Sequence, residues 1–168
     1  MSCNFVIRPM GLEDLLIVLT WRNHPEIRRY MFMQHSISAD EHREWFLKKQ
    51  NDATCRLLIV EDSKSSLGFA QFNNVVEGAS TDWGFYAKPD APRGVGRSFG
   101  ATLLKFAFQE LKVHKVCGQA IDFNTKSIEF HKRLGFSREG NLRDHVFIDG
   151  RYHSVFCFGI LENEWRPN

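Results

Sequence analysis

Six residues in the middle of the chain are suited to holding a phosphate group. Arg93, Gly94, Val95, Gly96, Arg97 and Ser98 follow the aromatic run TDWGFYA and lead into a run with helical spacing. A helix N-terminus has unpaired N–H groups and a partial positive charge, and glycine lets an anion approach them closely. The alternative is a flexible strand-to-helix connection, in which glycine is equally common.

This segment differs from the two commonest phosphate-binding motifs. It lacks the G-K-[ST] of a P-loop, and it is not the G-x-G-x-x-G of a dinucleotide-binding turn. It fits the pattern [Q/R]-x-x-G-x-[G/A], with Ser98 at the last small position.

The elements around this segment indicate an α+β protein with a mixed sheet and helices packed on it. The 168 residues suggest one domain, residues 1–168. Leucines at 12, 15, 16 and 19 mark an amphipathic helix that ends before Pro25, and Ser38 with Glu41 forms a capping box. We expect strands at 4–9, 55–62, 67–74, 81–88 and 115–121 and a hairpin over 145–161, and helices from 12, at 38–50, at 99–112 and at 124–134.

Composition excludes several classes of protein. Apolar residues make up 43% and charged residues 25%, as in globular proteins. A net charge of +2 with scattered basic residues gives no reason to expect a nucleic-acid partner. We expect no membrane span and no signal peptide, and therefore a cytoplasmic protein with reduced cysteines.

Together the Arg93–Ser98 segment, the aromatic strand before it and the later run NTKSIEFHKRLGF resemble the GNAT superfamily of acetyl-CoA-dependent N-acetyltransferases. The second motif is carried by Asn124, Ser127, Gly135 and Phe136. The resemblance covers nearly the whole chain. It implies a mostly antiparallel, twisted sheet of about seven strands, with strands four and five splayed apart and about four helices around it.

The resemblance also implies which residues bind acetyl-CoA. The Arg93–Ser98 segment would bind the pyrophosphate through backbone N–H groups, and the exposed backbone of the preceding strand would pair with the pantetheine arm. The expected set is Phe85, Tyr86, Ala87, Arg93, Gly94, Val95, Gly96, Arg97, Ser98, Asn124 and Ser127.

His131 stands where many GNAT enzymes have the tyrosine that protonates the departing thiolate. Histidine donates a proton near neutral pH, so His131 is the predicted acid; the alternative is a surface histidine with no role. Gln119 lies where related enzymes place a carboxylate, and it is predicted to relay a proton through water because an amide is no base. His145 and His153 lack further ligands at metal spacing, so no metal is expected.

Three outer segments, LTWRNHPEIRRYM, ISADEHREWF and the C-terminal stretch from Leu142, resemble the acetyltransferases of pseudaminic acid biosynthesis, a pathway tied to flagellin glycosylation. Those enzymes acetylate the 4-amino group of a UDP-linked 4-amino-4,6-dideoxy sugar. The WRN element also occurs in acetyltransferases of N-terminal alanine and of polyamines, which stay as alternatives. The predicted acceptor-binding residues are Arg22, Asn23, His42, Gln71 and Trp83.

Basic side chains in the first half of the chain suit phosphates, and its aromatic rings could stack on a base or pack in the core. A module that binds coenzyme A without catalysis remains a further alternative. A homodimer is left open, since the sequence does not fix the oligomeric state.

Overall fold

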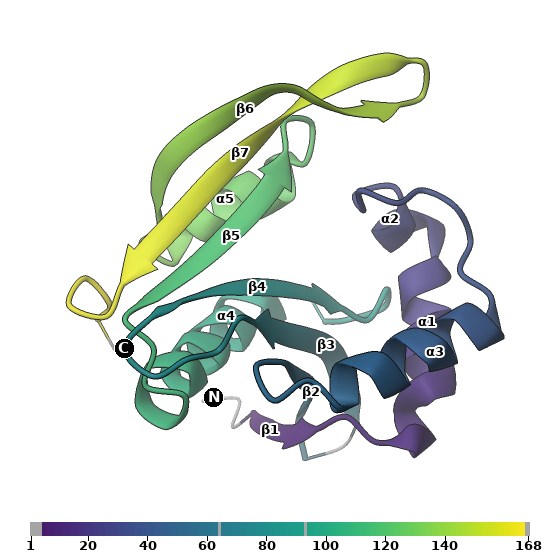
Figure 1. Ribbon diagram of the computed structural model, residues 1–168, viewed down its shortest axis with the longest axis horizontal. Coiled ribbons are helices and arrows are strands. Elements are labelled where there is room, and N and C mark those ends of the chain that lie inside the picture. The colour runs from purple at the N-terminus through teal and green to yellow at the C-terminus, as the bar shows by residue number, and fades with distance from the viewer. Residues whose placement is uncertain (1–4, 64, 93, 167–168) are drawn as a thin grey trace.

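The computed structural model describes residues 5–63, 65–92 and 94–166 (Figure 1). Within these residues the strands are β1 Val6–Pro9, β2 Arg56–Glu61, β3 Ser66–Asn73, β4 Ser80–Ala87, β5 Lys115–Ile121, β6 Ser137–Ile148 and β7 Arg151–Leu161. The helices are α1 Leu15–Asn23, α2 Pro25–Arg28, α3 Ala39–Gln50, α4 Val95–Lys105 and α5 Thr125–Arg133, with a 3₁₀ turn at Leu12–Asp14 and a π turn at Phe106–Glu110.

The seven strands form one sheet in the order β1-β2-β3-β4-β5-β7-β6. Of the strand pairs in the described residues, β4 with β5 is parallel and the others are antiparallel. This confirms the expected mixed α+β fold, with five helices in place of about four.

Pairing between β4 and β5 is short. It covers Ser80 to Asp82 against Lys115 to Cys117 and then stops. Beyond that point β4 stays paired with β3 through Ala87, and β5 stays paired with β7 through Ile121. The two strands diverge, as Figure 1 shows, which confirms the expected splay.

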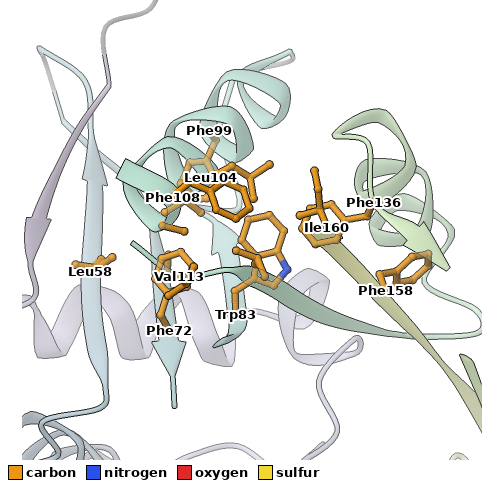
Figure 2. Packing of buried hydrophobic residues seen from close by; sticks show 14 of the residues in the cluster. Leu58, Phe72, Trp83, Phe99, Leu104, Phe108, Val113, Phe136, Phe158 and Ile160 are labelled. Carbon is orange, nitrogen blue, oxygen red and sulfur yellow. The ribbon is translucent and has the colours of Figure 1, made fainter. Parts of the chain in front are cut away.

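The two larger of three hydrophobic clusters in the described residues lie on opposite faces of the sheet. The larger packs α4 and α5 against one face, and Figure 2 shows Trp83 at its centre, between Phe72 of β3 and Phe136 after α5. The smaller packs α1 and α3 against Ile59 and Phe69. Side chains alternate along a strand, so β4 sends Trp83 to the first core and Tyr86 toward the second.

The buried face of α1 is not the leucine face. Leu12 and Leu16 are 58% and 77% exposed, whereas Asp14, Val18 and Trp21 are buried. These three positions recur with a helical spacing similar to that of the leucines, so the sequence pattern fits either face. Tertiary packing decides which of the two faces is buried. Ser38 caps α3 as predicted, accepting a hydrogen bond from the Glu41 N–H at 3.2 Å.

The C-terminal hairpin is longer than the sequence indicated. Its turn is as expected, with Asp149 and Gly150 at φ of +49° and +81°. However, β6 begins at Ser137, eight residues before the predicted start. Register shifts between Arg138 and Gly140 and between Leu142 and Val146 break the alternation that marks a strand.

Asp14 anchors the start of α1 to β1, and its removal should destabilise the fold. Its carboxylate accepts hydrogen bonds from the Arg8 guanidinium at 2.7 and 2.8 Å and from the Gly11 N–H at 2.8 Å, and Arg8 holds the pKa of this carboxyl below its usual range. Asp14→Ala should lower the free energy of unfolding by about 1–3 kcal/mol, because the partly buried donors of Arg8 and Gly11 lose this acceptor. Urea unfolding measures this, with exposed Glu13→Ala as control; equal losses would contradict the assignment.

Candidate functional site

The unpaired edge of β4 faces the gap between the splayed strands. The Lys88 N–H donates to the Leu67 carbonyl at 2.8 Å, which fixes the direction of the peptide groups at that end of β4. Because the direction alternates along a strand, the N–H and C=O groups of Phe85 and Ala87 point into the gap, and those of Tyr86 point to β3. An extended amide chain laid in the gap would pair with Phe85 and Ala87.

The N-terminus of α4 lies exposed beside this gap. Gly94 has a φ of +88°, which favours glycine. Val95 packs against the larger core, while Gly96, Arg97 and Ser98 are exposed. The N-cap residue Gly94 has no side chain to cap the helix. The Val95 N–H donates to the Pro92 carbonyl at 3.3 Å, and the N–H groups of the next residues lack intrahelical acceptors, as in any first helical turn. Arg93, predicted to bind the pyrophosphate, lies outside the described residues.

A cleft of about 470 Å³ separates this helix end from α5. Three cationic side chains line it: Arg97, Lys126 and Arg133. Glu129 also lines it, but its carboxylate is paired with Lys132 at 2.9 Å. The cleft therefore offers helix N–H groups and a surplus of positive charge, which is the chemistry that binds phosphates.

A larger cavity, of about 950 Å³, continues from the gap to α1, α2 and α3. Its lining includes Gly96, Ser127 and Phe130 at one end and Arg22 and His42 at the other. The floor comes from the sheet face opposite α4 and α5. Four polar side chains lie on that face and line the cavity: Gln71, Asp82, Cys117 and Gln119.

Two polar groups at the far end have no hydrogen-bond partner among the described residues. They are Nη1 of Arg22 and Nε2 of His42, both buried. The other terminal nitrogen of Arg22, Nη2, donates to the Met33 carbonyl at 3.0 Å, and the His42 ring stacks on Trp45 at 5.1 Å. Burial lowers the pKa of His42, so its ring is neutral at pH 7.

Asn23 and Asn124 have structural tasks. The side-chain amide of Asn23 donates to the Ile37 carbonyl at 2.8 Å and accepts from the Ile37 N–H at 2.9 Å. This ties the segment before α3 to α1 and leaves the predicted acceptor contact of Asn23 without support. Asn124 caps α5 by accepting from the Ser127 N–H at 3.1 Å. Asn124 and Ser127 also line the larger cavity, and their contact with acetyl-CoA stays a prediction.

The structure joins Trp83 and His131 in a buried, hydrogen-bonded pair, and their predicted roles as acceptor contact and acid stay predictions. Trp83 is 7% exposed and packs in the larger core on the α5 side of the sheet, and both it and His131 also contribute to the lining of the larger cavity. His131 is 1% exposed. Its Nδ1 donates to the Ser127 carbonyl at 2.8 Å, and its Nε2 accepts from the Trp83 indole N–H at 3.2 Å. In this arrangement the ring carries its proton on Nδ1, where the Ser127 carbonyl accepts it, and Nε2 faces the indole N–H with its lone pair.

Gln119 and Asp82 lie close to the start of the splay. Gln119 is exposed and its side-chain N–H₂ lies 3.8 Å from the Cys157 sulfur; its predicted relay role stays a prediction. Asp82 was missed by the sequence analysis. It is an exposed carboxylate on the cavity floor that accepts from Asn74 at 2.9 Å. Strand alternation from the aromatic Trp83 and Phe85 would have placed it on that face.

Comparison with known proteins settles the family. The model of the acetyltransferase (GNAT) domain matches residues 4–137. The chain belongs to the GNAT family. It is 30% identical to the uncharacterized N-acetyltransferase YokL of a Bacillus subtilis prophage, over 98% of this chain and 94% of that protein.

Two further relatives are also acetyltransferases by name. Acetyltransferase PseH of Campylobacter jejuni is 27% identical over 83% of this chain and 87% of its own length. The structure of spermidine N-acetyltransferase from Vibrio cholerae in complex with CoA and spermine superposes with a TM-score of 0.88, at 26% identity, over 95% of this chain and 96% of that one.

The protein is therefore an acetyl-CoA-dependent N-acetyltransferase. Its residues fit the cosubstrate: the uncapped helix end and cationic cleft suit phosphates, and the gap beside β4 suits the amide arm. In the described part of the chain, no helix is long and apolar enough to cross a membrane, and no group of three potential metal ligands occurs. The cytoplasmic location and the homodimer stay predictions.

Gly96→Val should weaken acetyl-CoA binding by at least about tenfold without loss of stability. A Cβ at Gly96 would meet only the Phe130 ring, at 3.8 Å, so the fold tolerates it. The added isopropyl group would stand in front of the α4 N–H groups. Calorimetric titration with acetyl-CoA measures the change. Thr102→Val, later on the same helix, is the control. An unchanged acetyl-CoA affinity in folded Gly96→Val would contradict the assignment of this helix end to pyrophosphate binding.

Two of the buried histidines, His42 and His131, should make the fold sensitive to mild acid. Burial lowers the pKa of both His42 and His131. The unfolded chain takes up these protons near the ordinary pKa of about 6.5 while the folded chain resists, so stability is full above that pH and falls below it. His131→Gln should flatten the slope of unfolding free energy between pH 7.5 and 5.5 by up to about 1.4 kcal/mol per pH unit. An unchanged slope in folded His131→Gln would contradict this prediction.

Proposed function

We propose that the acceptor is a nucleotide-linked amino sugar, and that the chain acetylates the 4-amino group of a UDP-linked amino-dideoxy sugar in pseudaminic acid biosynthesis. The observation that carries this proposal is the buried, unpartnered Nη1 of Arg22 at the acceptor end of the cavity. A guanidinium N–H can only donate a hydrogen bond. Its partner must therefore be an oxygen or another acceptor.

A nucleotide sugar carries such acceptors in its phosphates, carbonyls and hydroxyls. A polyamine at neutral pH is protonated and offers only donors. The unpartnered His42 Nε2 presents a proton or a lone pair according to its tautomer, and a hydroxyl satisfies either. Trp45, stacked on His42, adds an apolar ring face to the same end of the cavity. The likeness to PseH supports the same substrate class.

Under this proposal Asp82 accepts the proton of the attacking amine. Its carboxylate is exposed on the cavity floor at the last pair of β4 with β5, where the splay begins. The N–H groups of Phe85 and Ala87, which face the gap, would bind the amide arm of the cosubstrate and stabilise negative charge on the carbonyl oxygen. Holding both reactants in the gap supplies the remaining gain in rate.

A polyamine is the second candidate. The fold similarity to the spermine-bound Vibrio cholerae enzyme favours it, as do the carboxylates of Glu26, Glu41 and Asp82 in the cavity lining. Glu41, however, is already paired with His35 at 2.9 Å. This leaves fewer carboxylates for a polycation and keeps the nucleotide sugar as the proposed substrate.

Thiol release from acetyl-CoA with a UDP-linked 4-amino-4,6-dideoxy sugar and with spermidine distinguishes the two. We expect kcat/KM to be at least about a hundredfold higher for the sugar, a difference of about 2.7 kcal/mol. Arg22→Gln should raise the KM for the sugar by about tenfold and leave the dissociation constant of acetyl-CoA unchanged, because only the acceptor loses its partner.

Arg43→Gln is the matched control, since Arg43 is exposed on α3 next to His42. A higher kcat/KM for spermidine than for the sugar would contradict the proposal and favour a polyamine as the acceptor. A wild-type KM for the sugar in Arg22→Gln would remove Arg22 from the acceptor site.

A further inference from the structure

The point at which β4 and β5 part is occupied by a hydrogen-bonded pair of side chains. The last paired residues are Asp82 and Cys117, so Trp83 and Gly118 are the first residues past the split. A Cβ added at Gly118 would come within 2.6 Å of the indole Nε1 of Trp83, and closer still to Nε2 of His131. The Trp83–His131 pair thus fills the space that a side chain at position 118 would need.

Hydrogen bonds fix the tautomer of His131. The Ser127 carbonyl can only accept, so Nδ1 carries the proton of the 2.8 Å bond between them. The indole N–H of Trp83 can only donate, so Nε2 provides the lone pair of the 3.2 Å bond. A neutral ring in this tautomer satisfies both partners. A proton on Nε2 would set two donors against each other.

Aromatic rings enclose the pair. The His131 ring is stacked on Phe158 at 4.8 Å and 12°, and meets Phe136 edge-on at 5.0 Å. Phe130 and Phe85 lie 5.9 and 6.2 Å from it. The contacts described for the ring from β4, α5, β7 and the residue after α5 are all with uncharged groups. By strand alternation the side chains of Asp82 and Cys117 point to the face opposite Trp83, and both line the cavity that His131 also lines.

We propose that His131 is a positioning residue: as a neutral acceptor it locks the Trp83 indole beneath Gly118 and so holds β4 and β5 apart where the thioester must lie. The proton for the departing thiolate then comes from another source, such as water. Any acceptor amine requires this geometry, so the inference does not depend on the proposed sugar substrate.

Substitution by glutamine separates positioning from acid catalysis. The amide oxygen of His131→Gln can reach the place of Nε2 and accept from Trp83, but an amide cannot donate a proton as an acid does. We expect acetyl-CoA affinity and single-turnover rate within about threefold of wild type. His131→Phe keeps a ring and leaves the indole N–H buried without a partner, so the acetyl-CoA dissociation constant should rise by about tenfold.

If His131 instead acts as the acid, the opposite results are expected for the two variants. The single-turnover rate would fall by about a hundredfold in both variants, and the dissociation constant of acetyl-CoA would barely move. That outcome would overturn the proposal. The pH profile gives a second readout: the wild-type rate should fall on the acid side as Nε2 takes up a proton, and His131→Gln should lack that part of the fall.

Trp83→Phe tests the pair with His131 intact, and it serves if the position-131 variants do not fold. It should reproduce the loss of acetyl-CoA affinity seen in His131→Phe, and the double variant should lose little more, because the two side chains act as one unit. Trp165→Phe, whose ring packs on Phe108 away from the splay, is the control. Wild-type affinity in folded Trp83→Phe would also overturn the proposal.

Discussion

The separation of β4 from β5 is the constraint on which the rest of the structure depends. Three residue pairs join the strands, and beyond Asp82 and Cys117 each strand keeps its other neighbour and leaves one edge unpaired. Unpaired backbone groups in a protein interior are costly. They persist at this gap because a substrate with its own amide groups can pair with them.

The two larger cores lie on either side of that gap and supply different parts of the site. The α4 and α5 side supplies a helix end suited to phosphates, the cationic cleft and the Trp83–His131 pair that we propose keeps the strands apart. The α1 and α3 side supplies the acceptor end of the cavity, where two buried polar groups have no hydrogen-bond partner among the described residues. Donor and acceptor chemistry therefore come from opposite faces of one sheet and meet where the sheet opens.

Much of the fold was predictable from local pattern. Gly135 ends α5, Asp149 and Gly150 form the hairpin turn, and β5 runs over the predicted residues. These features depend on residues close in sequence. The buried face of α1 was not predictable in this way: Leu16 is exposed and Asp14 is buried, because Arg8 of a neighbouring strand supplies the partner for that carboxylate. Site residues divide along the same line. The backbone cradle at Gly94 and Gly96 is a local feature, whereas the state of His131 depends on Trp83, 48 residues away.

The protonation state of His131 tests this account most directly. Long-range ¹H–¹⁵N correlation spectra of the imidazole, recorded at pH 7 with and without bound acetyl-CoA, distinguish a protonated nitrogen from one with a free lone pair. The account predicts a neutral ring in both states, with the proton on Nδ1 and the lone pair on Nε2 facing the indole N–H. A ring protonated on Nε2 in the acetyl-CoA complex would contradict it, because His131 would then hold a proton to give and could not accept from Trp83.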